Sequence, residues 1–230
     1  MIRTALQLAA ILIVSGGCAF TCAGRRREAV HPLEAKFQAA GLIDIHTVDP
    51  TIRVRLVNAD AGDNFFGEDF YDGLQTAYLQ PAVAKRLSAA QAELKKRCSD
   101  CSLLVMDAAR PVAVSKAMWD EMQGSRFEKY VANPAKGSMH NFGAAVDVTI
   151  VDGEETLLDM GFIPFYKRKL GIAIAFAAHK RSGLTEAQRK NRRLLKQIMA
   201  SAGFTPLAHE WWHFNGFAKP VIRRRYSPIP

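Results

Sequence analysis

The spacing of apolar residues along the chain predicts both helices and strands. Between residues 80 and 97, apolar positions recur at three- and four-residue intervals, as on one face of a helix. Between residues 145 and 151, valine and isoleucine alternate with other residues, as in a strand with one face packed on a core. The same criteria predict strands at 52–57, 103–106 and 210–214, and helices at 114–123 and 186–202.

Strands and helices in this order suit an α+β fold, in which helices flank a small antiparallel sheet. A chain of 230 residues with 49% hydrophobic content can bury one sizeable core, and no internal repeat interrupts it. We therefore expect a single domain at residues 43–218. A linker or N-terminal arm would precede it at 25–42, and a basic tail would follow at 219–230.

Two short motifs carry the residue types of a metal site. The first runs from Ser138 to Asp147 and contains His140, and the second runs from Glu210 to His213. Two imidazoles and a carboxylate can hold a zinc ion at three points and leave a fourth position open for water. Glu210 remains as a free carboxylate that can take a proton from that water. Together the motifs predict a zinc hydrolase.

The first motif needs a turn if it is to bind a metal. On one continuous strand, His140 and Asp147 would lie on opposite faces. The small residues that begin at Gly143 allow the backbone to turn between them. The competing interpretation is a histidine in a loop, followed by a strand with a solvent-facing aspartate.

The second motif leaves two questions open. Glu210 and His213 share a face on a helix but lie on opposite faces of a strand, and the aromatic run between them favours a buried strand or its irregular end. His209 is an alternative ligand, because residues 209 and 213 alternate onto one face. In the competing interpretation, Trp211 and Trp212 belong to the core and His213 is a hydrogen-bonded core histidine.

Both motifs occur within a longer series of blocks that resembles the bacterial D-alanyl-D-alanine dipeptidases. The resemblance runs from about residue 43 to about residue 214 and rests on five blocks in order: Asp63-Asn64-Phe65-Phe66-Gly67, Asp107-Ala108-Ala109-Arg110-Pro111, the block from His140 to Asp147, the basic segment 191–195, and the block from Glu210 to His213. This group contains zinc peptidases, including D,D-carboxypeptidases acting on peptidoglycan precursors, and shares a fold with the hedgehog signalling domain. The resemblance implies zinc-dependent hydrolysis of D-alanyl-D-alanine or a related D-amino-acid-containing peptide, and thus a small peptide or peptidoglycan-derived substrate.

The resemblance also implies roles for individual residues. His140, Asp147 and His213 match the ligands of one zinc ion per chain. Glu210 matches the general base, which deprotonates the attacking water and later passes the proton to the leaving amine. Arg110 matches an arginine that faces the scissile carbonyl, where a guanidinium can stabilise the developing oxyanion.

Other matches are more loosely defined. The competing interpretation of Arg110 is a surface ion pair with Asp107. Ser138 matches a serine near the substrate, and Asn64 and Phe65 are expected to shape the pocket.

One position departs from the pattern of the dipeptidases. They carry Met-Gly followed shortly by Phe-Asp, and that aspartate lies near the free amino group of the substrate. Here Tyr166 stands where the aspartate is expected, and Asp159 is the alternative partner. A neutral phenol cannot pair with an ammonium group as a carboxylate does, so the departure concerns the preference for a free dipeptide rather than the metal chemistry.

Two alternative functions therefore stay open. One is a D,D- or L,D-carboxypeptidase that trims stem peptides, which would need a more open pocket. The other is a non-catalytic module of the same fold that binds the cell wall. Glu210 and Arg110 favour an enzyme, because binding alone requires neither residue.

The N-terminal residues resemble an export signal. A basic start at Arg3 is followed by an apolar run from Ala5 to Val14, which is too short for an ordinary membrane span. Cys18 follows two glycines, as at a bacterial lipoprotein cleavage site, and both lipidation and ordinary cleavage stay open. We expect residues 1–24 to be this signal and the protein to reside in the periplasm or cell envelope.

Cysteines and charge add two further expectations. Cys98 and Cys101 lie beyond the signal, and in an oxidising compartment they are expected to form a local disulfide. The net charge of +9 is scattered along the chain and lacks the interleaved aromatic residues of an RNA-binding surface, so we expect no nucleic-acid partner. The sequence leaves the oligomeric state open.

Overall fold

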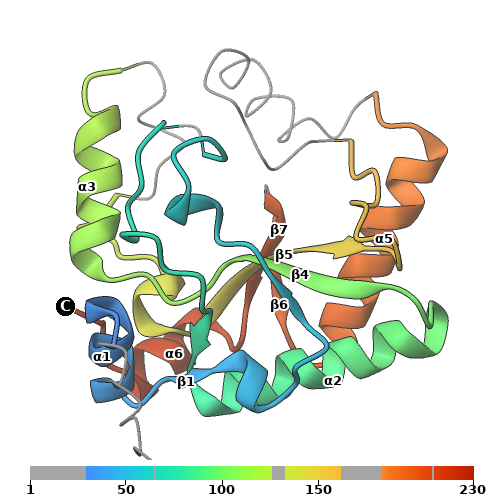
Figure 1. The fold of residues 1–230 in the computed structure, drawn as a ribbon, viewed down its shortest axis with the longest axis horizontal. Helices are drawn as coiled ribbons and strands as arrows, with labels where there is room; N and C mark the ends of the chain where they lie inside the picture. The colour runs from blue at the N-terminus through green and yellow to red at the C-terminus, as the bar shows by residue number, and fades with distance from the viewer. Residues whose placement is uncertain (1–29, 65, 126–132, 162–182, 209) are drawn as a thin grey trace, which may run out of the picture.

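A five-stranded sheet with the order β2-β4-β5-β7-β6 forms the centre of the protein (Figure 1). The computed structural model describes residues 30–64, 66–125, 133–161, 183–208 and 210–230. The strands of this sheet are β2 (Arg53–Val54), β4 (Ser102–Asp107), β5 (Ala145–Val151), β6 (Thr205–Leu207) and β7 (Glu210–Asn215). A separate antiparallel pair joins β1 (Ile43–Asp44) to β3 (Tyr78–Leu79). The expected α+β class is confirmed.

One edge of the central sheet differs from the expected antiparallel arrangement. β2 pairs with β4 in parallel, whereas all the other neighbours pair antiparallel. Parallel neighbours need a long crossover connection, and here it contains β3 and the helix α2 (Pro81–Arg97). Only two residues of β2 join the ladder, too few for an alternation to reveal its direction in the sequence.

Two helices cover one face of the sheet. α2 packs against β4 and against α5 (Glu186–Ser201), and α5 in turn contacts β6 and β7 (Figure 1). The residues that predicted α2 by their spacing are fully buried in this layer: Leu87, Ala90 and Leu94. The alternating residues of β5 are also fully buried: Val146, Val148 and Ile150. The patterns of period 3.6 and period 2 therefore meet in one core.

The other face of the sheet carries shorter elements. These are α3 (Val112–Met122), which follows Pro111, and the 3₁₀ helices η2 (Val57–Ala59) and η4 (Met139–Phe142). A third 3₁₀ helix, η1 (Ile45–Thr47), follows β1, and the segment after it bonds to α2 through Asp49 and Ser88. In Figure 1, α3 stands apart from α2 and α5, on the far side of the sheet. A cavity lies on this face, lined by residues of η2, η4, β5 and β7.

Both ends of the described chain pack into the domain. The predicted N-terminal arm contains the helix α1 (Pro32–Ala39), and the predicted basic tail contains the helix α6 (Lys219–Arg225). Phe37, Ile222 and Ile229 are buried in the core. The backbone N–H of Ile229 donates to Asn141 O at 2.7 Å, and Ile229 O accepts from Val112 N at 2.9 Å. The C-terminal residues therefore brace η4, which carries a predicted metal ligand.

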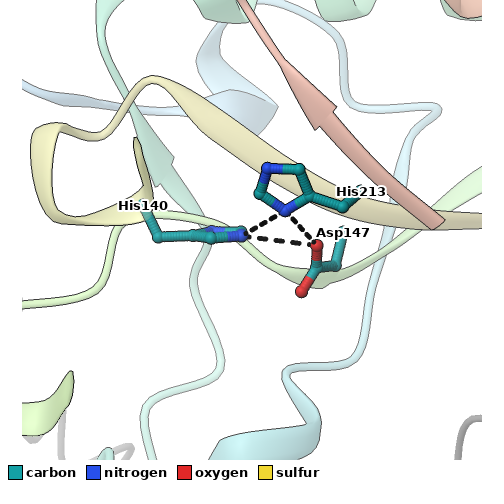
Figure 2. Close-up of side chains that lie close together, drawn as sticks. All are labelled: His140, Asp147 and His213. Atoms are coloured by element: carbon teal, nitrogen blue, oxygen red, sulfur yellow. Dashed lines mark hydrogen bonds and ion pairs between the residues drawn. The ribbon is translucent and has the colours of Figure 1, made fainter. Parts of the chain in front are cut away.

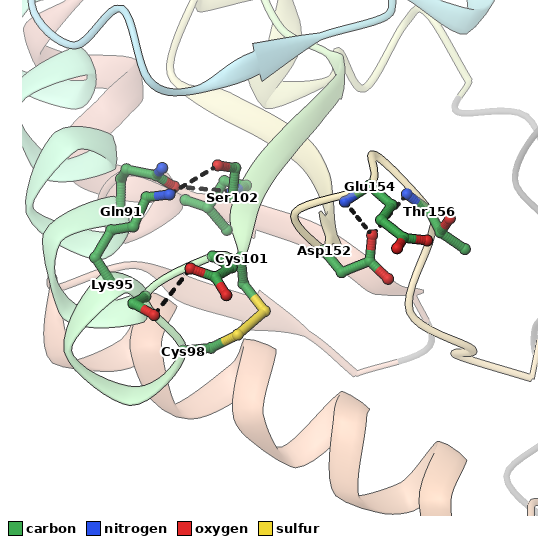
Figure 3. Close-up of a disulfide and its surroundings, with 11 residues drawn as sticks. Gln91, Lys95, Cys98, Cys101, Ser102, Asp152, Glu154 and Thr156 are labelled. Carbon is green, nitrogen blue, oxygen red and sulfur yellow. Dashed lines mark hydrogen bonds between the residues drawn. A yellow bond between two sulfur atoms is a disulfide. The ribbon is translucent and has the colours of Figure 1, made fainter.

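The expected disulfide between Cys98 and Cys101 is present (Figure 3). It closes the turn that joins α2 to β4. Beside it, Gln91 Oε1 accepts the backbone N–H of Leu103 at 2.8 Å, and Lys95 Nζ donates to Ser102 Oγ at 3.2 Å. These contacts fix the start of β4, and thus the position of Asp107 at its other end.

The predicted signal, including Cys18, lies outside the described residues. Each helix in the described part of the chain is too short or too polar to cross a bilayer.

Gly143 offers a test of the turn between η4 and β5. Its φ is +60°, and a Cβ added there would lie 2.5 Å from Cδ2 of the buried Leu42. We expect Gly143→Ala to lower the free energy of unfolding by about 2–4 kcal/mol, from backbone strain plus overpacking. Urea denaturation followed by circular dichroism would measure the change.

Gly73→Ala is the matched control. Gly73 has a φ of +76°, but a Cβ there would meet nothing within 4 Å. This variant should lose only the strain contribution, about 1 kcal/mol. Equal losses in the two variants would show that contact with Leu42 does not restrict position 143.

Candidate metal centre and active site

The three predicted ligands converge on one face of the sheet (Figure 2). His140 lies in η4, Asp147 on β5 and His213 on β7. Asp147 and His213 are direct partners in the antiparallel ladder, and paired residues share a face. Gly143 ends η4 in the left-handed conformation, which returns the chain to β5 and brings His140 over the same face. The turn required by the sequence is therefore present.

The ligand atoms form a small triangle. His140 Nε2 lies 3.1 Å from His213 Nδ1 and 3.3 Å from Asp147 Oδ1, and His213 Nδ1 lies 3.0 Å from the same oxygen. Atoms bound about 2.0–2.1 Å from one tetrahedral metal ion lie about 3.3 Å from each other. The triangle thus has the size that a shared metal ion requires.

Hydrogen bonds on the outer side of each imidazole determine which nitrogen faces the triangle. His140 Nδ1 donates to Ala108 O at 2.7 Å, and His213 Nε2 donates to Asn215 Oδ1 at 3.1 Å. Both acceptors lack a proton, so each ring must place its N–H there and direct its lone pair inward. Two lone pairs and a carboxylate oxygen then face one another, a donor set that fits a divalent cation.

The electrostatics of the triangle favour positive charge within it. Burial raises the pKa of Asp147, but the charges and hydrogen bonds of His140 and His213 outweigh burial and hold that pKa well below its usual range. Burial lowers the pKa of His213, yet the hydrogen bond and charge of Asp147 raise it overall. A proton and a metal ion would therefore compete for the same position.

Glu210 lies beside the triangle at the start of β7. Its Oε2 is 3.7 Å from His213 Nδ1, and its side chain is 33% exposed. The pairing of β6 with β7 shifts register between Pro206–Phe214 and Leu207–Glu210. Because of this irregularity, Glu210 and His213 line the same cavity although regular alternation would separate residues three apart. His209, the alternative ligand, lies outside the described residues.

The sequence offered two interpretations of Arg110, an arginine of the active site and an ion-pair partner of Asp107, and the structure contains both features. It forms an ion pair with Asp107, but the pair is buried, with side chains 13% and 1% exposed. Arg110 also lines the cavity with the ligands. Burial lowers the pKa of the guanidinium, but Asp107, followed by Tyr71 and Asp147, more than compensates and raises that pKa overall, so Arg110 remains charged. The partner was predicted correctly, whereas a surface location was wrong.

All of these groups face one cavity of about 370 Å³. Among the described residues, it brings together the predicted site residues Asn64, Arg110, Ser138, His140, Asp147, Glu210 and His213. Trp212, which the competing interpretation assigned to the core, also lines it. Phe65 lies outside the described residues.

Comparison with known proteins identifies the family. The sequence matches the D-Ala-D-Ala dipeptidase family over residues 38–229. The chain belongs to this family. The D-alanyl-D-alanine dipeptidase of Escherichia coli (strain K12) is 32% identical over 194 residues, covering 81% of this chain and 91% of the relative. The D-alanyl-D-alanine dipeptidase of Synechocystis sp. is 29% identical over 184 residues, covering 63% of this chain and 71% of the relative. That of Enterococcus faecalis is 26% identical over 173 residues, covering 69% of this chain and 83% of the relative.

Membership of the D-Ala-D-Ala dipeptidase family confirms the resemblance and, with the ligand triangle, the assignment as a metallopeptidase. The matched region extends beyond residues 43–214 and includes α6 and Ile229. This agrees with the packing of the C-terminal residues against η4. The non-catalytic alternative loses support, because the full set of metal, base and arginine positions faces one cavity.

Two pocket residues of the family pattern also organise the backbone. Asn64 Nδ2 donates to three carbonyl oxygens, and its Oδ1 accepts from Phe66 N and Gly67 N, each at 2.9 Å. Ser138 Oγ accepts the N–H of His140 at 3.3 Å and caps η4. Asn64 therefore shapes the wall of the cavity, whereas Ser138 acts on the segment that bears a ligand.

Tyr166 and Asp159 are the two residues that bear on the departure from the dipeptidase pattern. Tyr166 lies outside the described residues. Asp159 is not among the residues that line the described cavity, and its carboxylate accepts from Gly161 N at 2.8 Å and Gln188 Nε2 at 2.9 Å. These contacts do not favour Asp159 as the partner of a substrate amino group.

Asn215 was not recognised in the sequence, and it provides a test of the metal centre. Asn215→Ala removes the acceptor that fixes the orientation of His213, so we expect the affinity for Zn²⁺ to fall about 10- to 100-fold. Competition with a chromophoric chelator would measure it. Asn191→Ala is the control, because Asn191 bonds to Asp159 O away from the site and should retain full affinity. Equal affinities in all three proteins would contradict the assigned role.

Proposed function

We propose that the protein is an exported, zinc-dependent dipeptidase that hydrolyses D-alanyl-D-alanine, or a related D-amino-acid-containing peptide, in peptidoglycan metabolism. The observation that carries the proposal is the shared cavity: the ligand triangle, the partly exposed carboxylate of Glu210 and a fixed guanidinium at Arg110 all face it. The relatives named D-alanyl-D-alanine dipeptidase support the choice of substrate.

The donor set supports zinc as the metal. Two imidazole nitrogens and one carboxylate oxygen suit a borderline-soft ion, and three protein ligands are typical of catalytic rather than structural zinc. When bound, zinc would lower the pKa of a coordinated water molecule and polarise the carbonyl group of the substrate.

Glu210 is placed for proton transfer. Its carboxylate borders the ligand triangle, yet it remains one-third exposed to the cavity (33%). It would accept the proton of the attacking water and then donate it to the nitrogen of the leaving amino acid. General acid–base catalysis of this kind typically contributes about 10²- to 10⁴-fold to the rate.

Arg110 would act on the oxygen of the reacting carbonyl. Attack by water places negative charge on the carbonyl oxygen, and a guanidinium that is already oriented stabilises this charge without reorganising. Removing one such donor typically costs about 10²- to 10³-fold in rate. The buried pair with Asp107 keeps Arg110 charged and limits its movement.

The size of the cavity favours a small substrate. A volume of about 370 Å³ is near the lower end of the range of about 300–1,000 Å³ for ligand pockets. This volume is sufficient for a free dipeptide. Tyr166, which stands where the dipeptidases carry an aspartate, supports the alternative function, a carboxypeptidase acting on the end of a longer peptide.

Two observations support export to the periplasm or cell envelope. The N-terminal sequence resembles a signal, with Cys18 as a candidate site of lipidation. The pairing of Cys98 with Cys101 is typical of an oxidising compartment.

Purified protein should hydrolyse D-alanyl-D-alanine after zinc loading, lose activity with a chelator and regain it when zinc is restored. Released D-alanine would be measured, with a muropeptide ending in D-alanyl-D-alanine as the second substrate. Turnover of the muropeptide alone would favour the carboxypeptidase. No turnover of either substrate by zinc-loaded protein would overturn the proposal.

Glu210→Gln isolates the proton transfer. The amide cannot accept a proton, so we expect kcat to fall about 10²- to 10⁴-fold while bound zinc remains near one per chain. Metal analysis and dipeptide hydrolysis would be measured on the same preparation. Glu154→Gln, an exposed change outside the cavity, should leave both unchanged. An active Glu210→Gln enzyme would exclude Glu210 as the base.

A further inference from the structure

The carboxylate of Asp107 is the centre of a buried hydrogen-bond network. Its Oδ1 accepts from Tyr71 Oη at 2.7 Å and from Ala108 N at 2.9 Å. Its Oδ2 accepts from Asn58 Nδ2 at 3.1 Å and from Arg110 at both Nε, at 3.0 Å, and Nη2. Asp107 is 1% exposed, so these donors replace the water that an ionised carboxylate would otherwise require.

The network determines the direction in which Arg110 points. Asp107 accepts from one edge of the guanidinium, the edge formed by Nε and Nη2. The opposite edge, which includes Nη1, makes no hydrogen bond with the described residues and belongs to a side chain that lines the cavity. The guanidinium is planar, so fixing one edge fixes the other.

The position of Asp107 relative to the metal ligands follows from strand pairing. Asp107 is the ladder partner of Asp147 on β5, after a register shift in β4 between Val105 and Asp107, and Asp147 is the partner of His213 on β7. One row across three strands therefore carries Asp107 and two ligands. The ion pair with Asp107 therefore holds Arg110 at a defined place beside the metal centre, where Arg110 and the ligands line one cavity.

Tyr71 is the most buried donor of the network. The residue is 1% exposed, and its hydroxyl has a single proton, which it gives to Asp107. Burial and the neighbouring charge of Asp107 raise the pKa of Tyr71 well above its usual value, so the phenol remains a donor. Tyr71 and Asn58 together occupy one lone pair on each oxygen of Asp107.

Independent contacts hold the backbone at Arg110. Its N–H donates to His140 O at 3.0 Å, and its carbonyl accepts from Asn141 Nδ2 at 2.9 Å. These bonds do not involve Tyr71 or Asn58. Loss of the phenol hydroxyl should therefore release the side chains of Asp107 and Arg110 without displacing η4 or the ligand in it.

We propose that Tyr71 and Asn58 are positioning residues for the reaction, which act through Asp107 to aim the guanidinium of Arg110 at the developing oxyanion. The identity of that oxyanion rests on the proposed function, whereas the orientation of Arg110 does not. An effect confined to the transition state appears in kcat rather than in KM.

Tyr71→Phe tests the proposal while retaining the buried ring. We expect kcat for D-alanyl-D-alanine to fall about tenfold, the lower end of the usual range for one hydrogen bond to a charged group, with KM within about twofold and zinc content unchanged. Tyr78→Phe is the matched control, because Tyr78 is also buried but its hydroxyl accepts from Gln38, outside the cavity. Unchanged kcat in Tyr71→Phe, or a loss only in KM, would overturn the proposal.

A double-mutant cycle separates positioning from a general structural effect. If Tyr71 acts through Arg110, adding Tyr71→Phe to Arg110→Ala should change kcat less than about twofold. The same tenfold loss in both backgrounds would show that Tyr71 acts by another route. Asn58→Ala is the second variant. It should also lower kcat in the wild-type background and change it less than about twofold in Arg110→Ala, which keeps the test decisive if Tyr71→Phe fails to fold.

Arginine side-chain spectra provide a measure that is independent of turnover. In ¹H–¹⁵N spectra, the Nε–H of Arg110, assigned by its loss in Arg110→Ala, should exchange slowly with solvent in wild type and Tyr78→Phe. Tyr71→Phe should accelerate this exchange at least about tenfold, since a weakened partner exposes the group. Unchanged exchange would overturn the positioning role. Lack of dipeptide turnover in wild type would instead overturn the proposed function.

Discussion

The structure depends on a local electrostatic conflict that only positive charge relieves. Two imidazole lone pairs and a carboxylate oxygen face one another at 3.0–3.3 Å. Ala108 O and Asn215 Oδ1 hold the imidazole protons on the outer side, so neither ring can turn its N–H inward without losing a buried hydrogen bond. A bound metal ion would therefore couple its binding to the folding of this region, because it would stabilise this arrangement of lone pairs and a carboxylate oxygen.

The central strands make this arrangement reproducible. Asp107, Asp147 and His213 occupy one row across β4, β5 and β7, so the pairing of the strands sets their spacing. The core beneath, formed by the alternating residues of β5 and by α2 and α5, fixes which face the row occupies. A shift of register by one residue would direct the row into the core, where its charges would lack partners.

The sequence predicts the parts of this design that depend on local spacing. The strand at 145–151 and the helix at 80–97 were recognised because their apolar residues follow periods of 2 and 3.6, and the small residues after His140 predicted a turn. Tyr71, Asn58 and Asn215 have no such signal. The first two bond to Asp107 across separations of 36 and 49 residues, and only the folded sheet brings them together. α6 was missed because its arginines obscure a single buried residue, Ile222.

The charges around the cavity balance one another, and for this reason a buried partner for Arg110 is compatible with catalysis. Asp107 balances Arg110, and Asp147 with Glu210 would balance a divalent ion, so these groups carry no net charge before the reaction. When Glu210 takes a proton, its negative charge passes to the substrate oxygen, and the total stays constant. The cavity therefore needs a correctly directed dipole more than additional positive charge. A guanidinium paired along one edge supplies that dipole, since the edge without a hydrogen bond to the described residues stays oriented while Asp107 holds the other.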